Sequence, residues 1–146
     1  ESQGMLQRVI GEAIELVVRL DPEAWTIRAD RGQIHQVLMN LVLNAREAMP
    51  GGGVLTIETG NASQAAGDFL HLCVGDTGVG MDDNTRQRLF EPFFTTKSVS
   101  KGTGLGLATV FGVVTQAGGH LAVASEPDHG SVFSLYFPRL LVPASL

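Results

Sequence analysis

The sequence predicts an α+β two-layer sandwich, in which a mostly antiparallel mixed sheet carries about three helices on one face. Three observations lead to this fold class. Residues 31–49 show sustained helical periodicity. Short apolar or alternating segments follow one another in pairs, which favours antiparallel neighbours over a doubly wound parallel sheet. At 146 residues, the chain has room for one domain and little more.

The first half of the chain is predicted to contain one long helix, preceded by shorter elements. Residues 5–13 form a short helix or an incoming linker, residues 14–20 a strand and residues 25–28 a second short strand. Asp30 is placed to cap the helix over residues 31–49. The apolar positions at helical spacing are Ile34, Leu38, Leu41, Ala45 and Ala48. A proline and three glycines then end the helix.

The second half is predicted to contain two hairpins, separated by helical and irregular segments. The predicted strands are residues 54–59, 69–74, 120–125 and 131–137, with a polar turn at 60–67. A short polar helix or turn at 82–89, a loop at 90–101 and a helix at 105–116 lie between the hairpins. No internal repeat or low-complexity tract interrupts this order.

The composition excludes several classes of protein. Ten Lys and Arg against 15 Asp and Glu give a net charge of −5, the wrong sign for a nucleic-acid surface. No apolar run reaches the roughly 18–20 residues of a bilayer span. A single cysteine, Cys73, rules out an internal disulfide or a cysteine-based zinc site. None of the four histidines has metal-ligand spacing. We therefore expect a soluble domain of a reducing compartment.

Two amides on the long helix are candidate ligands. Asn40 and Asn44 are four residues apart, so they share a face, in a mostly apolar segment. A buried amide without a partner costs roughly 1–3 kcal/mol, so the pair needs an explanation. Either both amides hydrogen-bond neighbouring backbone in the core, or their oxygens are ligands of a hard cation such as Mg²⁺.

Glycine is abundant, with 18 residues in the chain, and two glycine segments are candidate ligand loops. Asp76-Thr-Gly-Val-Gly80 follows an apolar strand, although a lone D-x-G is often only a turn. Gly102-Thr-Gly-Leu-Gly106 opens a predicted helix, whose N-terminal N–H groups suit an anion. It lacks the glycine of a Rossmann fingerprint at Leu107, and no Walker A motif is present.

The segment between the two glycine loops has no clear period. Residues 89–101 contain three phenylalanines, two neighbouring threonines and two lysines. Such a stretch fits a mobile lid whose lysines meet phosphate, and equally an ordinary surface loop with buried phenylalanine anchors. The segment by itself leaves both interpretations open.

In this order, the motifs closely resemble those of the catalytic and ATP-binding domain of bacterial sensor histidine kinases. This domain belongs to the gyrase, chaperone, histidine kinase and mismatch-repair ATPase superfamily, which has the Bergerat fold. Asn40-Leu-Val-Leu-Asn44 resembles the N box, residues 76–80 the first glycine box, 90–94 the F box and 102–107 the second glycine box. The likeness runs over residues 14–138. It implies that 1–13 are the remnant of a linker from a dimerisation and phosphoacceptor domain, and that 139–146 are a tail.

The resemblance also implies roles for individual residues. Asn44 would bind Mg²⁺, Asn40 would support the phosphates, and Lys97 would be a contact from the lid. Asp76 would accept the adenine amino group, near Gly78 and Gly80, and Ser131 stands where the family often has threonine. The phosphates would be lined by Gly102, Thr103, Gly104, Leu105 and Gly106. One departure is Glu47, which occupies a position where many family members carry a basic residue.

The implied function is transfer of the γ-phosphoryl group of Mg-ATP to a histidine on a separate dimerisation and phosphoacceptor domain, in two-component signalling. A response-regulator receiver domain would act downstream. The domain would be cytoplasmic and monomeric, without direct contact with nucleic acid or membrane. The superfamily's ATP hydrolases place a water-activating glutamate where Asn40 stands, and an amide cannot act as a base near pH 7.

Two alternatives stay open. None of the four histidines lies in a phosphoacceptor motif, so the chain can also be interpreted as a regulatory module that binds nucleotide without transferring phosphate. The second alternative is an ATP hydrolase of the same superfamily, which Asn40 disfavours.

Overall fold

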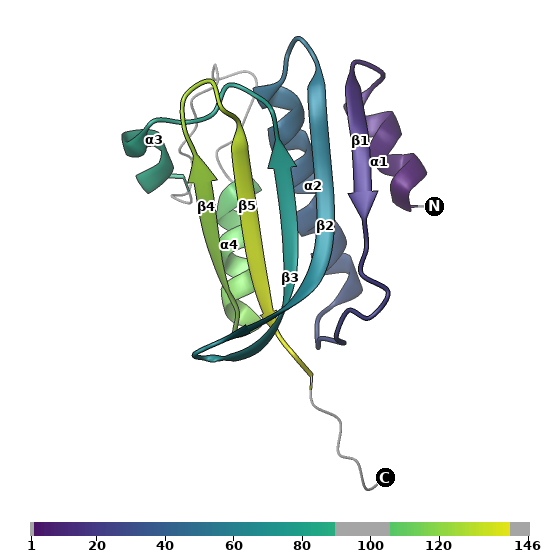
Figure 1. Ribbon diagram of the computed structural model, residues 1–146, viewed down its shortest axis with the longest axis vertical. Helices are drawn as coiled ribbons and strands as arrows, with labels where there is room; N and C mark the ends of the chain where they lie inside the picture. The colour runs from purple at the N-terminus through teal and green to yellow at the C-terminus, as the bar shows by residue number, and fades with distance from the viewer. Residues whose placement is uncertain (1, 90–105, 141–146) are drawn as a thin grey trace, which may run out of the picture.

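The computed structural model describes residues 2–89 and 106–140 and confirms the predicted α+β sandwich (Figure 1). Its five-stranded sheet has the order β1-β2-β3-β5-β4, with β1 parallel to β2 and the other neighbours antiparallel. The strands are β1 (Ile14–Arg19), β2 (Gly53–Gln64), β3 (Gly67–Asp76), β4 (His120–Ser125) and β5 (Ser131–Pro138). The helices are α1 (Ser2–Ile10), α2 (Arg31–Ala48), α3 (Asp83–Gln87) and α4 (Gly106–Gln116).

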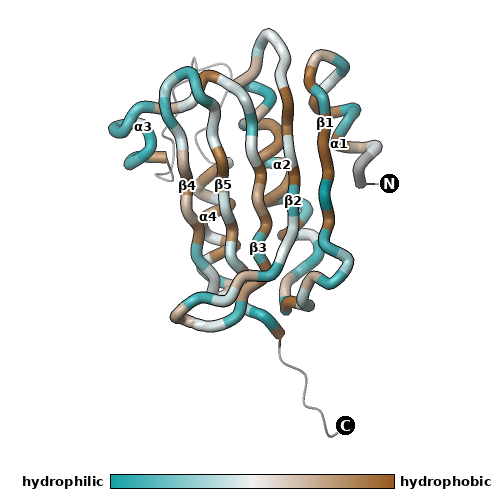
Figure 2. Tube along the Cα trace, viewed as in Figure 1, coloured by the Kyte–Doolittle hydropathy of each residue, from teal (hydrophilic) through white to brown (hydrophobic). Residues whose placement is uncertain are grey.

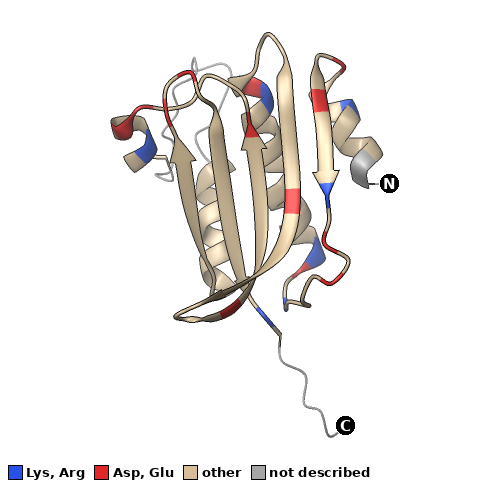
Figure 3. Ribbon diagram, viewed as in Figure 1, with Lys and Arg blue, Asp and Glu red and all other residues tan. Residues whose placement is uncertain are grey.

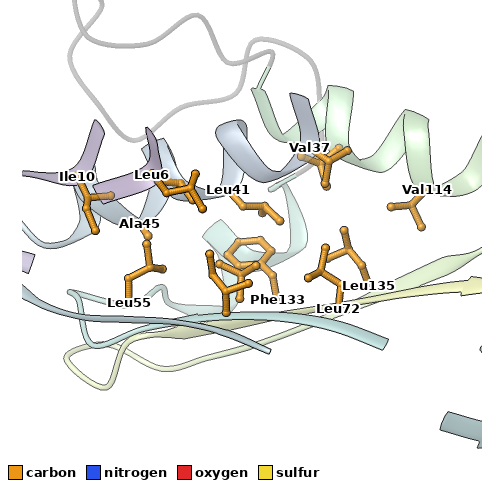
Figure 4. Packing of buried hydrophobic residues seen from close by; sticks show 14 of the residues in the cluster. Leu6, Ile10, Val37, Leu41, Ala45, Leu55, Leu72, Val114, Phe133 and Leu135 are labelled. Carbon is orange, nitrogen blue, oxygen red and sulfur yellow. The ribbon is translucent and has the colours of Figure 1, made fainter. Parts of the chain in front are cut away.

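Helices α1, α2 and α4 lie on one face of the sheet, and α3 stands at its edge (Figure 1). The core fills the space between the two layers. In Figure 4, Val37 and Leu41 of α2 and Val114 of α4 point toward the sheet, where Leu55 and Leu135 meet them. All five side chains are at most 1% exposed. Figure 2 shows polar residues gathered in α3 and the loops, and Figure 3 shows few charged residues along the strands.

The long helix forms as the sequence predicts. The Asp30 carboxylate accepts hydrogen bonds from the backbone N–H groups of Gly32 and Gln33, which confirms its capping role. The helix ends at Ala48, within one residue of the predicted end. Two of the predicted candidate residues, Asn40 and Asn44, therefore lie on a rigid element packed against the sheet.

Two local predictions were wrong. Residues 25–28 do not form a strand, since only the single bridge between Ile27 and Arg139 is present. The backbone N–H of Trp25 donates to the side chain of Asn61, and the carbonyl of Thr26 accepts the backbone N–H of Leu140, so single contacts hold this loop in place of a continuous ladder. The predicted turn at 60–67 is much shorter, because β2 continues to Gln64 and pairs with the start of β3.

The N-terminal segment packs onto the domain. Leu6 and Ile10 of α1 are 7% and 4% exposed and belong to the core. The Arg46 guanidinium of α2 donates to the carbonyl of Val9, 3.0 Å away, which ties the last turn of α2 to the end of α1. The division of the chain at residues 13 and 138 stays a prediction. Of the helices in residues 2–89 and 106–140, none is long and apolar enough to cross a membrane.

Replacing Gly112 with alanine is expected to raise the free energy of unfolding by about 0.5–1 kcal/mol. Gly112 lies inside α4, and a Cβ added there would meet no described atom within 4 Å outside the helix's own backbone. The gain comes from the conformational entropy that glycine loses on folding. Urea denaturation of the two proteins measures it, and a lower midpoint for the variant would contradict the prediction.

Candidate functional site

Asn40 connects α2 to the first residue of α4. Its amide N–H donates to the carbonyl of Gly106 at 3.0 Å, and its amide oxygen accepts from the Gln36 side chain at 2.8 Å. The two contacts determine how the amide is oriented, because each needs the opposite end of the group. Gln36 was not among the predicted site residues, although its position one turn before Asn40 is visible in the sequence.

Asn44 lies one turn further along the same helix face and is half-buried. Within the part of the chain that the structure describes, its side chain takes part in no hydrogen bond. A half-buried amide in this state retains its oxygen as an acceptor or as a ligand. Asn40 and Asn44 thus differ. The Asn40 amide hydrogen-bonds backbone, as the first of the two interpretations predicts, whereas the Asn44 amide oxygen is open to a ligand among the described residues.

Asp76 lies at the end of β3 and is 8% exposed. One carboxylate oxygen accepts the backbone N–H of Gly78 at 2.8 Å. Burial raises the pKa of Asp76, and hydrogen bonds from the backbone N–H groups of Gly78 and Ser131 oppose this rise. The result is a buried acceptor group at one end of the sheet, with oxygen lone pairs remaining beyond those two contacts.

The glycines after Asp76 pack against protein backbone. A Cβ on Gly78 would collide with the carbonyl oxygen of Ala48, and Gly80, at φ +69°, lies against the carbonyl of Glu126. The backbone N–H of Val79 donates to the carbonyl of Ala48 at 3.0 Å. The loop is therefore fastened to the last turn of α2, one turn beyond Asn44.

The structure thus gathers three predicted segments at one end of the sheet: the amides of α2, the loop after Asp76 and the start of α4 at Gly106. Ser131 lies beside Asp76 in the register of β3 and β5 and is 5% exposed. Lys97, Gly102, Thr103, Gly104 and Leu105, together with the expected lid and F box, lie outside the described residues.

Sequence reasoning also missed Ser125, the last residue of β4. Its hydroxyl oxygen lies 2.8 Å from that of Ser131 and 2.9 Å from the backbone N–H of Met81, which donates to it. The hydroxyl donates to the carbonyl of Gly130 at 3.0 Å. Only the register of β4 and β5 places Ser125 beside Ser131, so no local pattern identifies it.

Two other features lie apart from this site. On the other face of the sheet, the His71 and His120 rings stack on Tyr136, with centroid distances of 4.6 and 4.7 Å. Burial lowers the pKa of His71, which Glu58 opposes. A cleft of about 530 Å³ opens beside Arg28 and Arg139. None of the predicted site residues that the structure describes lines it.

Comparison with known proteins identifies related sequences. A family described as histidine kinase-, DNA gyrase B- and HSP90-like ATPases matches residues 29–141. The chain is 43% identical over 148 residues to the sensor kinase CckA of Brucella abortus (strain 2308). That alignment covers 94% of the chain but only 16% of CckA.

Solved structures show the same architecture. A mycobacterial sensor histidine kinase, MprB, superimposes with a TM-score of 0.79 at 28% identity, over 94% of this chain and 91% of that one. Full-length ShkA in complex with AMPPNP superimposes with a TM-score of 0.72 at 30% identity. In that case the match covers 99% of this chain and 30% of ShkA.

Proposed function

Because the chain belongs to the histidine kinase-, DNA gyrase B- and HSP90-like ATPase family, as the catalytic domain of a sensor histidine kinase, we propose that it binds Mg-ATP at the gathered segments. We further propose that it transfers the γ-phosphoryl group to a histidine on a separate dimerisation and phosphoacceptor domain. The chain spans 16% of the length of CckA, so both the acceptor domain and a downstream receiver domain would lie outside it.

The observation that carries the proposal is the convergence of Asn40, Asp76 and Gly106 at one end of the sheet. Asp76 supplies a buried acceptor for the adenine amino group, and the start of α4 supplies N–H groups for phosphate. The second N–H of the Asn40 amide is available to a phosphate oxygen, since Gly106 takes only one of the two. Full-length ShkA, whose structure contains this fold, was crystallised in complex with AMPPNP, which supports the proposal that the fold binds a nucleotide here.

The residues present also fit a magnesium ion. Asn44 offers an amide oxygen with no hydrogen bond in the described part of the chain, and oxygen ligands are those that Mg²⁺ prefers. The ion supplies neutralisation of the phosphate charge that develops during transfer.

Phosphoryl transfer, rather than hydrolysis, is the reaction that Asn40 favours. Its amide cannot take a proton from water near pH 7, and its orientation is held by Gln36 and Gly106. The residues of this site would therefore bind and position the nucleotide while an external histidine acts as nucleophile. Since ATP is the phosphoryl donor, we place the domain on the cytoplasmic side of the cell.

Two measurements test the proposal. A fluorescent ATP analogue titrated with Mg²⁺ or with EDTA should bind in both cases, and more tightly with the metal. With γ-labelled ATP, the chain should label the phosphoacceptor domain of the same kinase in trans. Binding without transfer would favour the regulatory module, whereas rapid steady-state hydrolysis would favour the ATP hydrolase.

A further inference from the structure

We propose that Ser125 makes Ser131 a pure hydrogen-bond acceptor and thereby contributes to the choice of base. The inference rests on the proposed function, since it concerns the end of the site assigned to adenine. It adds a residue that does not itself need to touch the nucleotide. Ser125 is a positioning residue that acts through Ser131.

The first observation is a row of polar residues across three strands. Asp76 of β3 pairs with Ser131 of β5, which pairs with Ser125 of β4. Side chains alternate along a strand, so Ser131 shares the helix-covered face with the buried Phe133. Asp76 and Ser131 are the two buried polar or charged residues among those described, 8% and 5% exposed. The row thus places oxygen atoms where the rest of the layer is apolar.

The second observation concerns where the hydroxyl protons of Ser125 and Ser131 are donated. Ser125 has one hydroxyl proton, and the carbonyl of Gly130 at 3.0 Å can only accept it. The Ser125 oxygen accepts from the backbone N–H of Met81 at 2.9 Å. Its contact with Ser131 at 2.8 Å is then a hydrogen bond only if Ser131 donates. The Ser131 proton is therefore committed to Ser125.

The consequence is a cluster of acceptors. The Asp76 carboxylate accepts, and Ser131 has only lone pairs left for a ligand or a bridging water. An amino group at the six-position of a purine can donate to such a cluster. An oxo group at that position finds no donor there and loses its hydrogen bond with water on binding. Ser125 thus favours adenine over a six-oxo purine.

The test compares ATP with inosine triphosphate, which differs from ATP at the six-position and at the neighbouring N1 proton. In Ser125→Ala the Ser131 hydroxyl is free to rotate and donate to the oxo group. We expect the ratio of the two dissociation constants to shift toward inosine triphosphate by about threefold to tenfold, the worth of one neutral hydrogen bond. In the Ser131→Ala background, Ser125→Ala should not change the ratio further. Isothermal titration calorimetry on the 146-residue chain measures all four proteins.

Three controls separate this role from general destabilisation. Ser134→Ala changes a residue of β5 three positions after Ser131, on the opposite face of the sheet, and should keep the wild-type ratio. Ser125→Thr retains the hydroxyl and should also keep it. Where the alanine variant unfolds, Ser125→Cys fills the same space with a weak donor and acceptor, and should shift the ratio in the same direction.

The outcomes are distinct. Equal weakening of both nucleotides in Ser125→Ala, with an unchanged ratio, would overturn the inference and leave nucleotide binding intact. A shift that persists in the Ser131→Ala background would overturn the route through Ser131. If the unchanged chain binds neither nucleotide, the proposed function fails and the inference fails with it.

Discussion

Replacing Asp76 with asparagine is expected to weaken ATP binding by about 1–3 kcal/mol while the domain stays folded. Asparagine keeps the size of the side chain and one acceptor oxygen, which can still receive the N–H of Gly78. It loses the charge that strengthens a hydrogen bond from the adenine amino group. Preference for ATP over GTP should shrink along with the affinity, and equal affinity of the unchanged chain for the two would contradict the assignment.

The same substitution should raise the free energy of unfolding relative to the unchanged chain as pH rises toward neutrality. Burial raises the pKa of Asp76 in the folded chain above its ordinary value of 3.8. Between that value and the raised folded-state pKa, the folded chain binds more protons than the unfolded chain. Asp76 therefore lowers the free energy of unfolding as pH rises through this window. Asparagine does not titrate, so the variant's advantage should be small near about pH 3.5 and larger at about pH 7.

A matched control for Asp76 lies on the same strand. Asp68 stands near the start of β3, at the opposite end from Asp76, and its carboxylate is paired with Arg139 at 3.5 Å. Asp68→Asn removes the same charge from a half-exposed position. It should leave ATP affinity unchanged and should not reproduce the stability gain at neutral pH. Urea denaturation at several pH values, with nucleotide titration at pH 7, compares the two variants.

Local rules explain which parts of the fold the sequence predicts well. The helix α2 follows from its periodicity, from the cap at Asp30 and from the glycines behind it, all within about twenty residues. The prediction of a strand at 25–28 was wrong because the conformation of this loop depends on Asn61, 36 residues away. The side chain of Asn61 accepts the backbone N–H of Trp25. No pattern within the segment distinguishes such a loop from an edge strand.

The candidate site also contains residues that the sequence predicts and residues that only the structure reveals. Asn40, Asn44 and Asp76 can be proposed from the sequence because their motifs are short and ordered along the chain. Their neighbours cannot. The bond from Asn40 to Gly106 spans 66 positions, and Ser125 reaches Met81 across 44. The partners of a predicted residue are set by sheet register and helix packing, so they appear only in the structure.

The structure adds a second reason for the glycines to the one that the sequence suggests. Two glycines after a strand suggest a backbone that a ligand approaches closely. In the structure, the close neighbours of Gly78 and Gly80 are the carbonyls of Ala48 and Glu126. These contacts hold the loop against α2 and the β4–β5 turn, and thereby position Asp76. A glycine motif can thus serve a site through packing as well as through direct contact.

Replacing Asn44 with alanine is expected to remove most of the benefit that Mg²⁺ gives to ATP binding. Affinity for Mg-ATP should fall by about tenfold to hundredfold, since even outer-shell partners of a metal are worth that much. Affinity for metal-free ATP should change far less, because the lost group is an oxygen ligand for the ion and not a contact to the base. Titration with Mg²⁺ and with EDTA gives both values for each protein.

Two variants separate a metal ligand from a structural amide. Asn44→Asp keeps an oxygen at the same position and adds a negative charge, so the dependence of ATP binding on Mg²⁺ should persist. Asn84→Ala removes an exposed amide from α3 and should leave that dependence unchanged. Alanine is the better helix former at position 44, and no hydrogen bond in the described part of the chain is lost there, so the free energy of unfolding should not fall. If Asn44→Ala weakens both forms of ATP by the same factor, Asn44 supports the helix packing, and the ion must be held by other groups.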